Sequence, residues 1–244
     1  MQKNAYTIGA VTAACPLLIF LFGVTTLFAT MIAFLVLEPD FFTKEFPNIS
    51  RVSIRGTGYF ILVTGMSVTG ICILRSVHLV VTLHTHAISR FAHGAAQRRR
   101  WRLQNHLPWV FSAVAALSFA GRSIPVSGSM HVWFSLVFLV AQGLLILTDA
   151  LLVIAIGRNA AGRYPLATGT WMRIRGGIAG VLFVFGIIML ILYYGQAYLP
   201  GWLVPRAYSL YAIFLWLYAF LSLGYCGAYF PDVLRVRRQP DWSR

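Results

Sequence analysis

Residues 8–37 read IGAVTAACPLLIFLFGVTTLFATMIAFLVL, thirty positions without a charged side chain. A helix that crosses a bilayer needs about 20 apolar residues at a rise of 1.5 Å each, so this run is long enough to span. It is also longer than the apolar core of a cleavable signal peptide, about 7–15 residues. We therefore expect it to be an uncleaved membrane anchor.

The composition of the whole chain agrees with the membrane anchor expected at residues 8–37. The 244 residues are 59% hydrophobic and 11% charged, and the mean hydropathy is +0.74. A soluble domain of this size carries about 25% charged residues. The composition thus excludes a soluble globular protein and predicts an all-α, polytopic integral membrane protein.

Four further apolar runs are long enough to span, and a sixth segment is shorter. Arg102 and Arg122 flank the short segment, and both side chains can extend to the two interfaces. Asn105 is expected to cap its first turn. The sequence predicts one domain, residues 1–244, with six transmembrane helices at residues 8–37, 58–84, 105–122, 131–156, 176–198 and 207–230.

The basic residues predict the orientation of these helices. With six spans, fourteen of the 20 Lys and Arg residues fall on one side and five on the other, while Arg75 lies within a span. Because basic residues near helix ends stay cytoplasmic, both termini are expected in the cytosol, or in the matrix of a mitochondrion. This pattern also explains the net charge of +14 without nucleic acid as a partner. The densest cluster, expected to bind anionic headgroups, is Arg98, Arg99, Arg100 and Arg102.

Two opposite charges are expected at one depth in the membrane. A rise of 1.5 Å per residue places Arg75 about 24 Å and Asp149 about 27 Å from the same end of the bundle. A charge buried alone in lipid costs about 2.5–3.5 kcal/mol. We therefore predict an ion pair between Arg75 and Asp149, with His78 one turn from Arg75. The alternative is a buried pair without any chemical role.

Motifs for catalysis and cofactor binding are absent from the sequence. The three cysteines lie in predicted spans without metal-ligand spacing, and no nucleophile motif is present. The last two predicted helices contain no histidine, which argues against a di-haem cytochrome. No catalytic residue, metal or cofactor is assigned, and whether the protein is an enzyme stays open.

Two smaller features have alternative interpretations. Tyr211, Tyr218 and Tyr225 recur every seven residues, which is typical of a packed helix seam and less often of a lipid groove. Asn48 begins an Asn-Ile-Ser sequon on the predicted non-cytosolic side, and is therefore a candidate for N-glycosylation.

Several short stretches resemble one family of membrane proteins. These are residues 12–22, TAACPLLIFLF, residues 46–50, FPNIS, and residues 228–232, AYFPD, together with Arg75 followed by His84 or His86. They are similar to the Frag/DRAM/Sfk family of six-helix membrane proteins, which includes a GPI-anchor lipid-remodelling factor. The resemblance implies lipid handling, and GPI-anchor lipid remodelling in particular, in the Golgi or endoplasmic reticulum.

A second function class competes with this expectation. Six acidic residues and a pI near 10.5 also suit a non-catalytic accessory subunit of a large membrane complex, such as one in the mitochondrial inner membrane. The partners expected are therefore membrane lipids or other membrane subunits.

Overall fold

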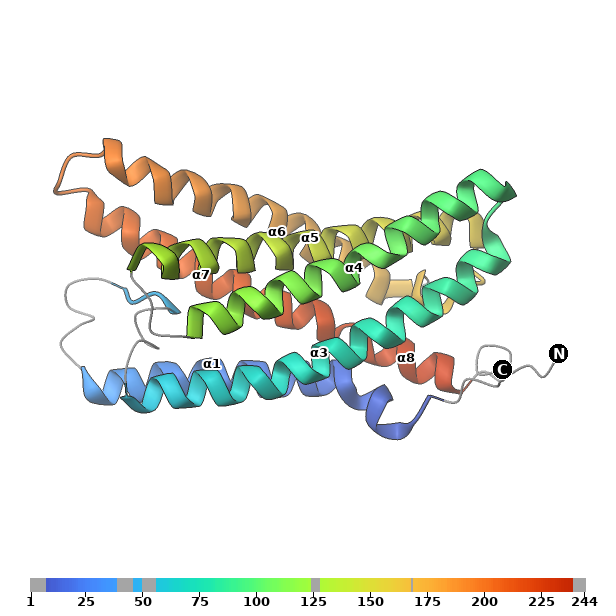
Figure 1. The fold of residues 1–244 in the computed structure, drawn as a ribbon, viewed down its shortest axis with the longest axis horizontal. Coiled ribbons are helices and arrows are strands. Elements are labelled where there is room, and N and C mark those ends of the chain that lie inside the picture. Colours follow the sequence, from blue (N-terminus) through green and yellow to red (C-terminus); the bar gives the residue numbers. More distant parts are fainter. Residues whose placement is uncertain (1–7, 39–45, 50–55, 124–127, 168, 239–244) are drawn as a thin grey trace.

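The computed structural model describes residues 8–38, 46–49, 56–123, 128–167 and 169–238. Regular structure in these ranges is helical, with no strand. The elements, shown in Figure 1, are α1 (Ala10–Leu37), α3 (Gly56–Phe91), α4 (Gly94–Ser123), α5 (Gly128–Ala160), η2 (Pro165–Ala167), α6 (Gly169–Gly195), η3 (Gln196–Tyr198), α7 (Val204–Gly227) and α8 (Phe230–Arg237).

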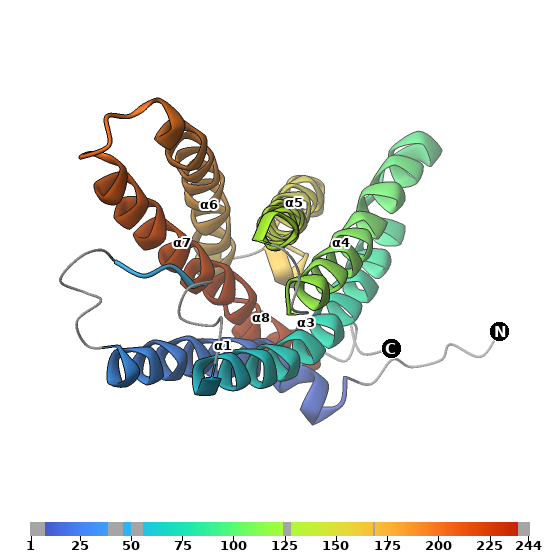
Figure 2. The same ribbon diagram turned by 60° about the vertical axis from the view of Figure 1, so that its left-hand side comes forward.

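The long helices form a ring in chain order. Each of α1, α3, α4, α5, α6 and α7 packs against the next, and α7 closes the ring against α1 (Figure 2). We call the end where α1 begins and α5 ends the basic end, and the other the opposite end. The start of α1 and the end of α8 both lie at the basic end (Figure 1).

Five of the described helical segments are long and apolar enough to cross a membrane, which makes this an integral membrane protein. They are Ala10–Leu37, Thr57–Phe91, Trp133–Ala160, Gly169–Tyr198 and Val204–Arg237. Helix α4 corresponds to the predicted third span but is not among them. The count of six spans and the cytosolic termini therefore remain predictions.

Helix α4 begins well before the apolar segment that predicted it. Its first turns, GAAQRRRWRLQ, contain mostly strong helix formers, and the side chain of Gln97 accepts a hydrogen bond from the His93 N–H, N···O 2.7 Å. The expectation that Asn105 caps this helix is wrong, because Asn105 lies inside α4 and is buried.

A short segment between α1 and α3, residues 46–49, docks onto α7. The indole nitrogen of Trp216 donates to the Pro47 carbonyl at 3.0 Å, and the Phe46 N–H donates to Ser209 Oγ at 3.0 Å. Ile49 is buried. Because Trp216 lies twelve residues into α7, about 18 Å at the helical rise, the segment enters the bundle from the opposite end.

Candidate functional site

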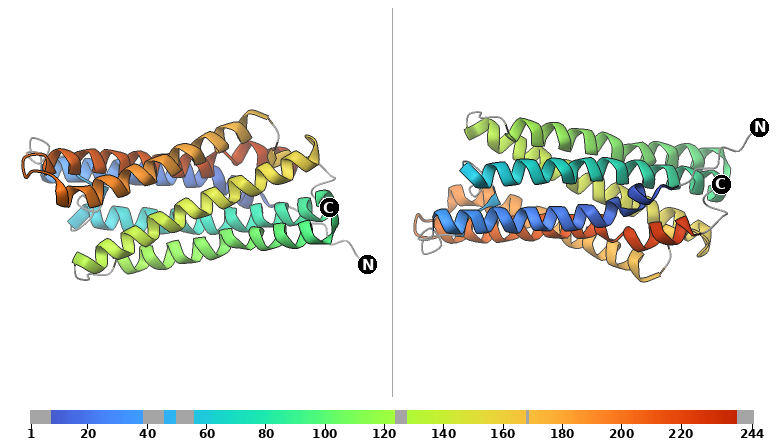
Figure 3. Two further views of the ribbon diagram at one scale, coloured as in Figure 1. Left: turned by 90° about the horizontal axis from the view of Figure 1, so that it is seen from above. Right: turned by 90° about the horizontal axis from the view of Figure 1, so that it is seen from below.

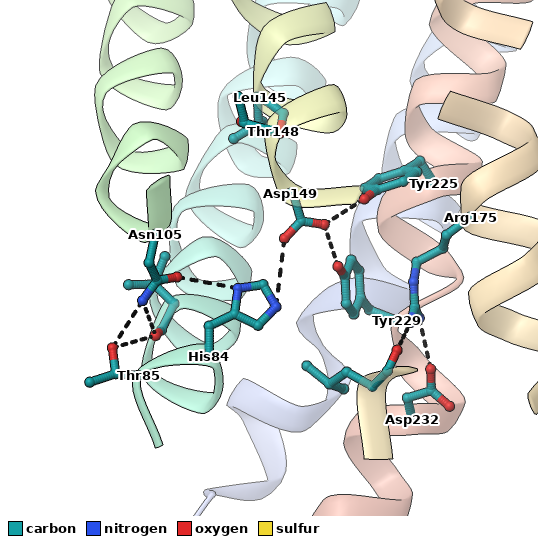
Figure 4. Close-up of polar contacts among 12 residues, drawn as sticks. His84, Thr85, Asn105, Leu145, Thr148, Asp149, Arg175, Tyr225, Tyr229 and Asp232 are labelled. Carbon is teal, nitrogen blue, oxygen red and sulfur yellow. Dashed lines mark hydrogen bonds and ion pairs between the residues drawn. The ribbon is translucent and has the colours of Figure 1, made fainter. Parts of the chain in front are cut away.

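Two adjoining features occupy the space between α5, α6 and α7. In the basic half, a buried cluster of polar side chains joins these helices to α3, α4 and α8 (Figure 4). In the opposite half, the same three helices enclose an apolar cavity.

Asp149 of α5 is the centre of the polar cluster. Tyr225 and Tyr229 both donate hydrogen bonds to its Oδ2, the first at 2.5 Å. The other carboxylate oxygen, Oδ1, lies 4.0 Å from Nε2 of His84 in α3. Two phenol donors and a nearby imidazole compensate the charge of a carboxylate that is only 6% exposed.

Asn105 fixes the orientation of His84. The Asn105 amide nitrogen donates to the Val81 carbonyl and to Thr85 Oγ1, each at 3.0 Å. Its carbonyl oxygen is therefore the atom 3.2 Å from His84 Nδ1, and this assigns a proton to Nδ1. In a neutral imidazole, Nε2 then presents a lone pair towards Asp149, so a bridging water or a second ring proton would satisfy both atoms.

Arg175 of α6 makes the second set of contacts in the cluster. Its guanidinium donates to the Asp232 carboxylate at 2.8 Å, to the Ala228 carbonyl at 3.1 Å and to the Leu166 carbonyl. It also lies over the Tyr229 ring, 4.0 Å from the centroid. One buried cation thus ties α6 to η2, to the end of α7 and to α8.

The buried ring of Tyr164 packs against His84, 6.0 Å between ring centroids. Tyr164 belongs to the connection between α5 and α6. Burial raises the pKa of the Tyr164 phenol well above its ordinary value, since a phenolate is poorly solvated there. The phenol is therefore neutral, and Tyr164 lies on the side of the cluster that faces the basic end.

The predicted ion pair between Arg75 and Asp149 is not formed. Arg75 and His78 are both exposed on the outer surface of α3, and His78 instead packs edge-on against Trp109, 6.0 Å between ring centroids. At about 100° per residue, positions nine apart on a helix point in opposite directions. His84 therefore faces the interior, towards Asp149, while Arg75 faces outward.

A small cavity of about 50 Å³ adjoins Asp149. Ser76, Tyr225 and Tyr229 also line it, and the hydroxyl of Ser76 is buried without a hydrogen-bond partner among the described residues. A site of this size and polarity can hold buried water.

The larger cavity has a volume of about 450 Å³, within the range of about 300–1,000 Å³ typical of ligand sites. One face of α5 and one face of α6 form its walls, with lining residues spaced three and four apart on both helices. From α5 these are Ser135, Leu136, Leu139, Val140, Gly143, Leu144 and Leu147, and from α6 they are Ala179, Leu182, Phe183, Gly186, Ile187, Met189, Leu190 and Tyr193.

The cavity opens sideways, towards the surface that would face lipid. Phe183 is 56% exposed and Val140 is 47% exposed, whereas Leu182 and Tyr218 in the inner wall are buried. Figure 3 shows the yellow-green α5 crossing the bundle obliquely, so that it approaches the orange α6 at the basic end and diverges from it towards the opposite end.

The structure divides the predicted tyrosine stripe. Tyr211 and Tyr218 line the large cavity, and Tyr218 donates to the Leu139 carbonyl at 3.1 Å. Tyr225 lies deeper, in the polar cluster. Two members of the stripe therefore line the large cavity and the third packs in the interior, and contact of the stripe with lipid stays a prediction.

Asn48 also lines the large cavity, and its amide nitrogen donates to the Tyr208 hydroxyl at 2.6 Å. A glycan would be attached to that same nitrogen. Glycosylation at Asn48 stays a prediction, and a glycan on this nitrogen would have to fit beside Tyr208.

The four arginines of the predicted headgroup site, Arg98, Arg99, Arg100 and Arg102, are exposed near the start of α4. Trp101 between them is buried, 5% exposed, so its side chain packs in the interior of the bundle. Binding of anionic lipid to these arginines remains a prediction.

Comparisons of the chain with family models, with curated proteins and with solved structures find no match. The function must therefore be inferred from the cavity and the polar cluster themselves. Among the described residues no group of three or more His, Cys, Asp or Glu side chains could hold a metal ion.

Proposed function

We propose that this protein handles membrane lipids, and that the cavity between α5, α6 and α7 holds an acyl chain. The observation that carries the proposal is the cavity itself: about 450 Å³, walled mainly by Leu, Ile, Val and Phe side chains, and open on its side. A lipid chain can enter such a groove from the bilayer without crossing water.

The polar cluster keeps this groove closed at one end. Asp149 binds α5 to α7, and Arg175 binds α6 to α7 and α8. In the opposite half, Tyr218 of α7 donates a hydrogen bond to the Leu139 carbonyl of α5. These polar contacts hold the helices together in the basic half, and we expect α5 and α6 to separate around a ligand in the other half.

The resemblance to the Frag/DRAM/Sfk family supports a more specific role within this proposal. A protein that remodels the lipid of a GPI anchor must accommodate an acyl chain within the membrane, as this cavity would. We therefore propose GPI-anchor lipid remodelling in the Golgi or endoplasmic reticulum as the pathway in which the cavity functions.

Lipid binding can be tested by mass spectrometry of the purified protein. Gly186 lines the cavity and has open space beside it, and Gly180 of the same helix has open space but does not line it. We expect the wild type and Gly180→Leu to retain a co-purifying acyl lipid that Gly186→Leu loses. Equal retention by all three proteins would contradict the proposal.

The cellular role needs a separate experiment. In cells that lack the protein, we expect the acyl-chain composition of GPI-anchored proteins to change and Gly186→Leu to fail to restore it. An unchanged composition, with the protein co-migrating with a respiratory complex on native gels, would favour the accessory subunit.

A further inference from the structure

The chemistry of the cavity lining restricts the kind of lipid that fits. None of the described residues that line the cavity carries a charge. Transfer of an acyl chain from the bilayer into this groove exchanges one apolar surrounding for another, so the hydrophobic effect contributes little. Selection must then come from packing and from hydrogen bonds to the lipid head.

The polar lining residues collect at one end. Four elements bring them there: the segment before α3, the first turns of α5, the last turn of α6 and the first turns of α7. Tyr218 is the polar lining residue that does not lie at this end, and its hydroxyl donates a hydrogen bond to the Leu139 carbonyl. The polar residues at the opposite end are Asn48, Ser135, Tyr193, Tyr208 and Tyr211.

The remainder of the groove is apolar and runs towards the polar cluster. From Tyr193 to Ala179 the α6 wall rises about 21 Å at 1.5 Å per residue, and Leu147 faces the same region from α5. A lipid therefore fits with its head at the Asn48 end and its chain directed towards the basic end.

The head is restricted further by charge. Among the described residues that line this end, none carries a positive charge that could pair with a phosphate or a carboxylate, and a partly buried anion that lacks such a partner costs several kcal/mol. Hydroxyl, ester and amide groups, by contrast, match the hydroxyl and amide side chains present. Ser135 Oγ is buried and has no hydrogen-bond partner among the described residues, and a neutral head group would provide one.

We propose that the cavity binds one chain of an acyl lipid with an uncharged, hydrogen-bonding head, such as an acylglycerol or a ceramide, and that this head lies beside Asn48 and Tyr208. The proposal rests on the proposed function and specifies the ligand. It goes beyond that function because a general lipid groove has no preference for head charge or for the direction of the chain.

Photoactivatable lipids provide the test. The full-length protein in phosphatidylcholine nanodiscs is irradiated with diazirine-bearing diacylglycerol, ceramide, phosphatidylserine or phosphatidylinositol, and labelled peptides are identified by mass spectrometry. We expect the two neutral probes to label the α5 and α6 walls several-fold more than the two anionic probes. Equal or stronger labelling by the anionic probes would overturn the proposal while leaving lipid handling intact, and absence of labelling by any probe would overturn both.

The direction of the lipid is tested with two diacylglycerol probes. A diazirine next to the glycerol should label peptides that contain Asn48 or Tyr208, and a diazirine at the chain terminus should label peptides that contain Leu147 or Ala179. The reverse pattern, or identical patterns, would contradict the proposed orientation.

A hydroxyl-deletion pair isolates the hydrogen bonds of the head. Tyr208→Phe removes a hydroxyl at the head site, and Tyr198→Phe removes one from a side chain that is 90% exposed and does not line the cavity. We expect Tyr208→Phe to weaken labelling by the neutral probes by about two- to tenfold, with no change for Tyr198→Phe. Unchanged labelling of Tyr208→Phe would contradict the position of the lipid head beside Asn48 and Tyr208. Both variants should elute as the wild type in size-exclusion chromatography.

Discussion

Gly143 and Tyr218 are in contact across the floor of the large cavity: a Cβ on Gly143 would lie 2.8 Å from the Tyr218 hydroxyl. That hydroxyl donates to the Leu139 carbonyl one turn earlier on α5. The absence of a side chain at Gly143 thus lets α7 approach α5 and shapes the inner wall of the groove.

We predict that Gly143→Ala destabilises the protein by about 1–3 kcal/mol, as expected for overpacking. Since the clash involves the hydroxyl, Tyr218→Phe should relieve most of it, so the double variant should be more stable than Gly143→Ala alone. Unfolding titrations in mixed micelles would measure both. A double variant at least as unstable as the sum of the single variants would contradict this contact.

The polar cluster predicts a contrast between Asp149 and Arg75. Asp149→Leu leaves the Tyr225 and Tyr229 hydroxyls buried without their acceptor, and we expect the free energy of unfolding to fall by about 1–3 kcal/mol for each of them. Arg75→Gln changes an exposed side chain and should alter it by less than about 0.5 kcal/mol. Equal destabilisation by the two substitutions in the same titration would instead support the ion pair between Arg75 and Asp149 that the sequence predicts.

The reason that the sequence suggested the wrong partner is geometric. Counting residues along a helix gives the depth of a side chain, and Arg75 and Asp149 were matched by depth. The direction of a side chain around the helix axis depends on which face is packed, and in the span around Arg75 apolar residues lie on every side of the helix, so the sequence does not reveal its inner face. His84 is the histidine of this helix that contacts Asp149, as only the packed bundle shows.

The sequence predicts the bounds of a helix correctly where the helix and its apolar segment coincide, as for α1. It misses them where the helix continues beyond the apolar segment. Arg175 illustrates the consequence. The predicted fifth span begins at residue 176, so Arg175 was assigned to a loop, yet α6 begins at Gly169 and buries it. The chain has six acidic residues, and a carboxylate next to a span needs a cation. Asp232 could therefore have been identified from the sequence as a candidate partner of Arg175.

The Arg175 and Asp232 pair gives a further prediction. Arg175→Met leaves Asp232 buried with Arg235 as its remaining cation, 3.3 Å away, and we expect a loss of about 3–5 kcal/mol in the free energy of unfolding. Arg175→Lys should also be destabilising, since a single ammonium does not reproduce the planar fork of donors.

The control for this pair is the double variant Arg175→Met with Asp232→Leu, which removes both charges. It should recover a large part of the stability lost by Arg175→Met. A double variant that is less stable than either single variant would show that the buried charges are not coupled to each other.

The docked segment is tested through Trp216. Trp216→Phe removes the hydrogen bond to the Pro47 carbonyl, worth about 0.5–1.5 kcal/mol, and residues 46–49 should become more accessible. We expect Ile49→Cys, in a background without the three natural cysteines, to react with a maleimide about two- to tenfold faster when Trp216 is replaced. Equal rates would indicate that the Trp216 hydrogen bond does not hold the segment against α7.

The central claim, that an acyl lipid occupies the cavity between α5, α6 and α7, is tested most directly by an experimental structure of the protein in lipid nanodiscs. We expect elongated density between Leu144 and Phe183 that continues to Asn48 and Tyr208. A groove closed by its own side chains, or filled by a helix of another protein, would contradict it.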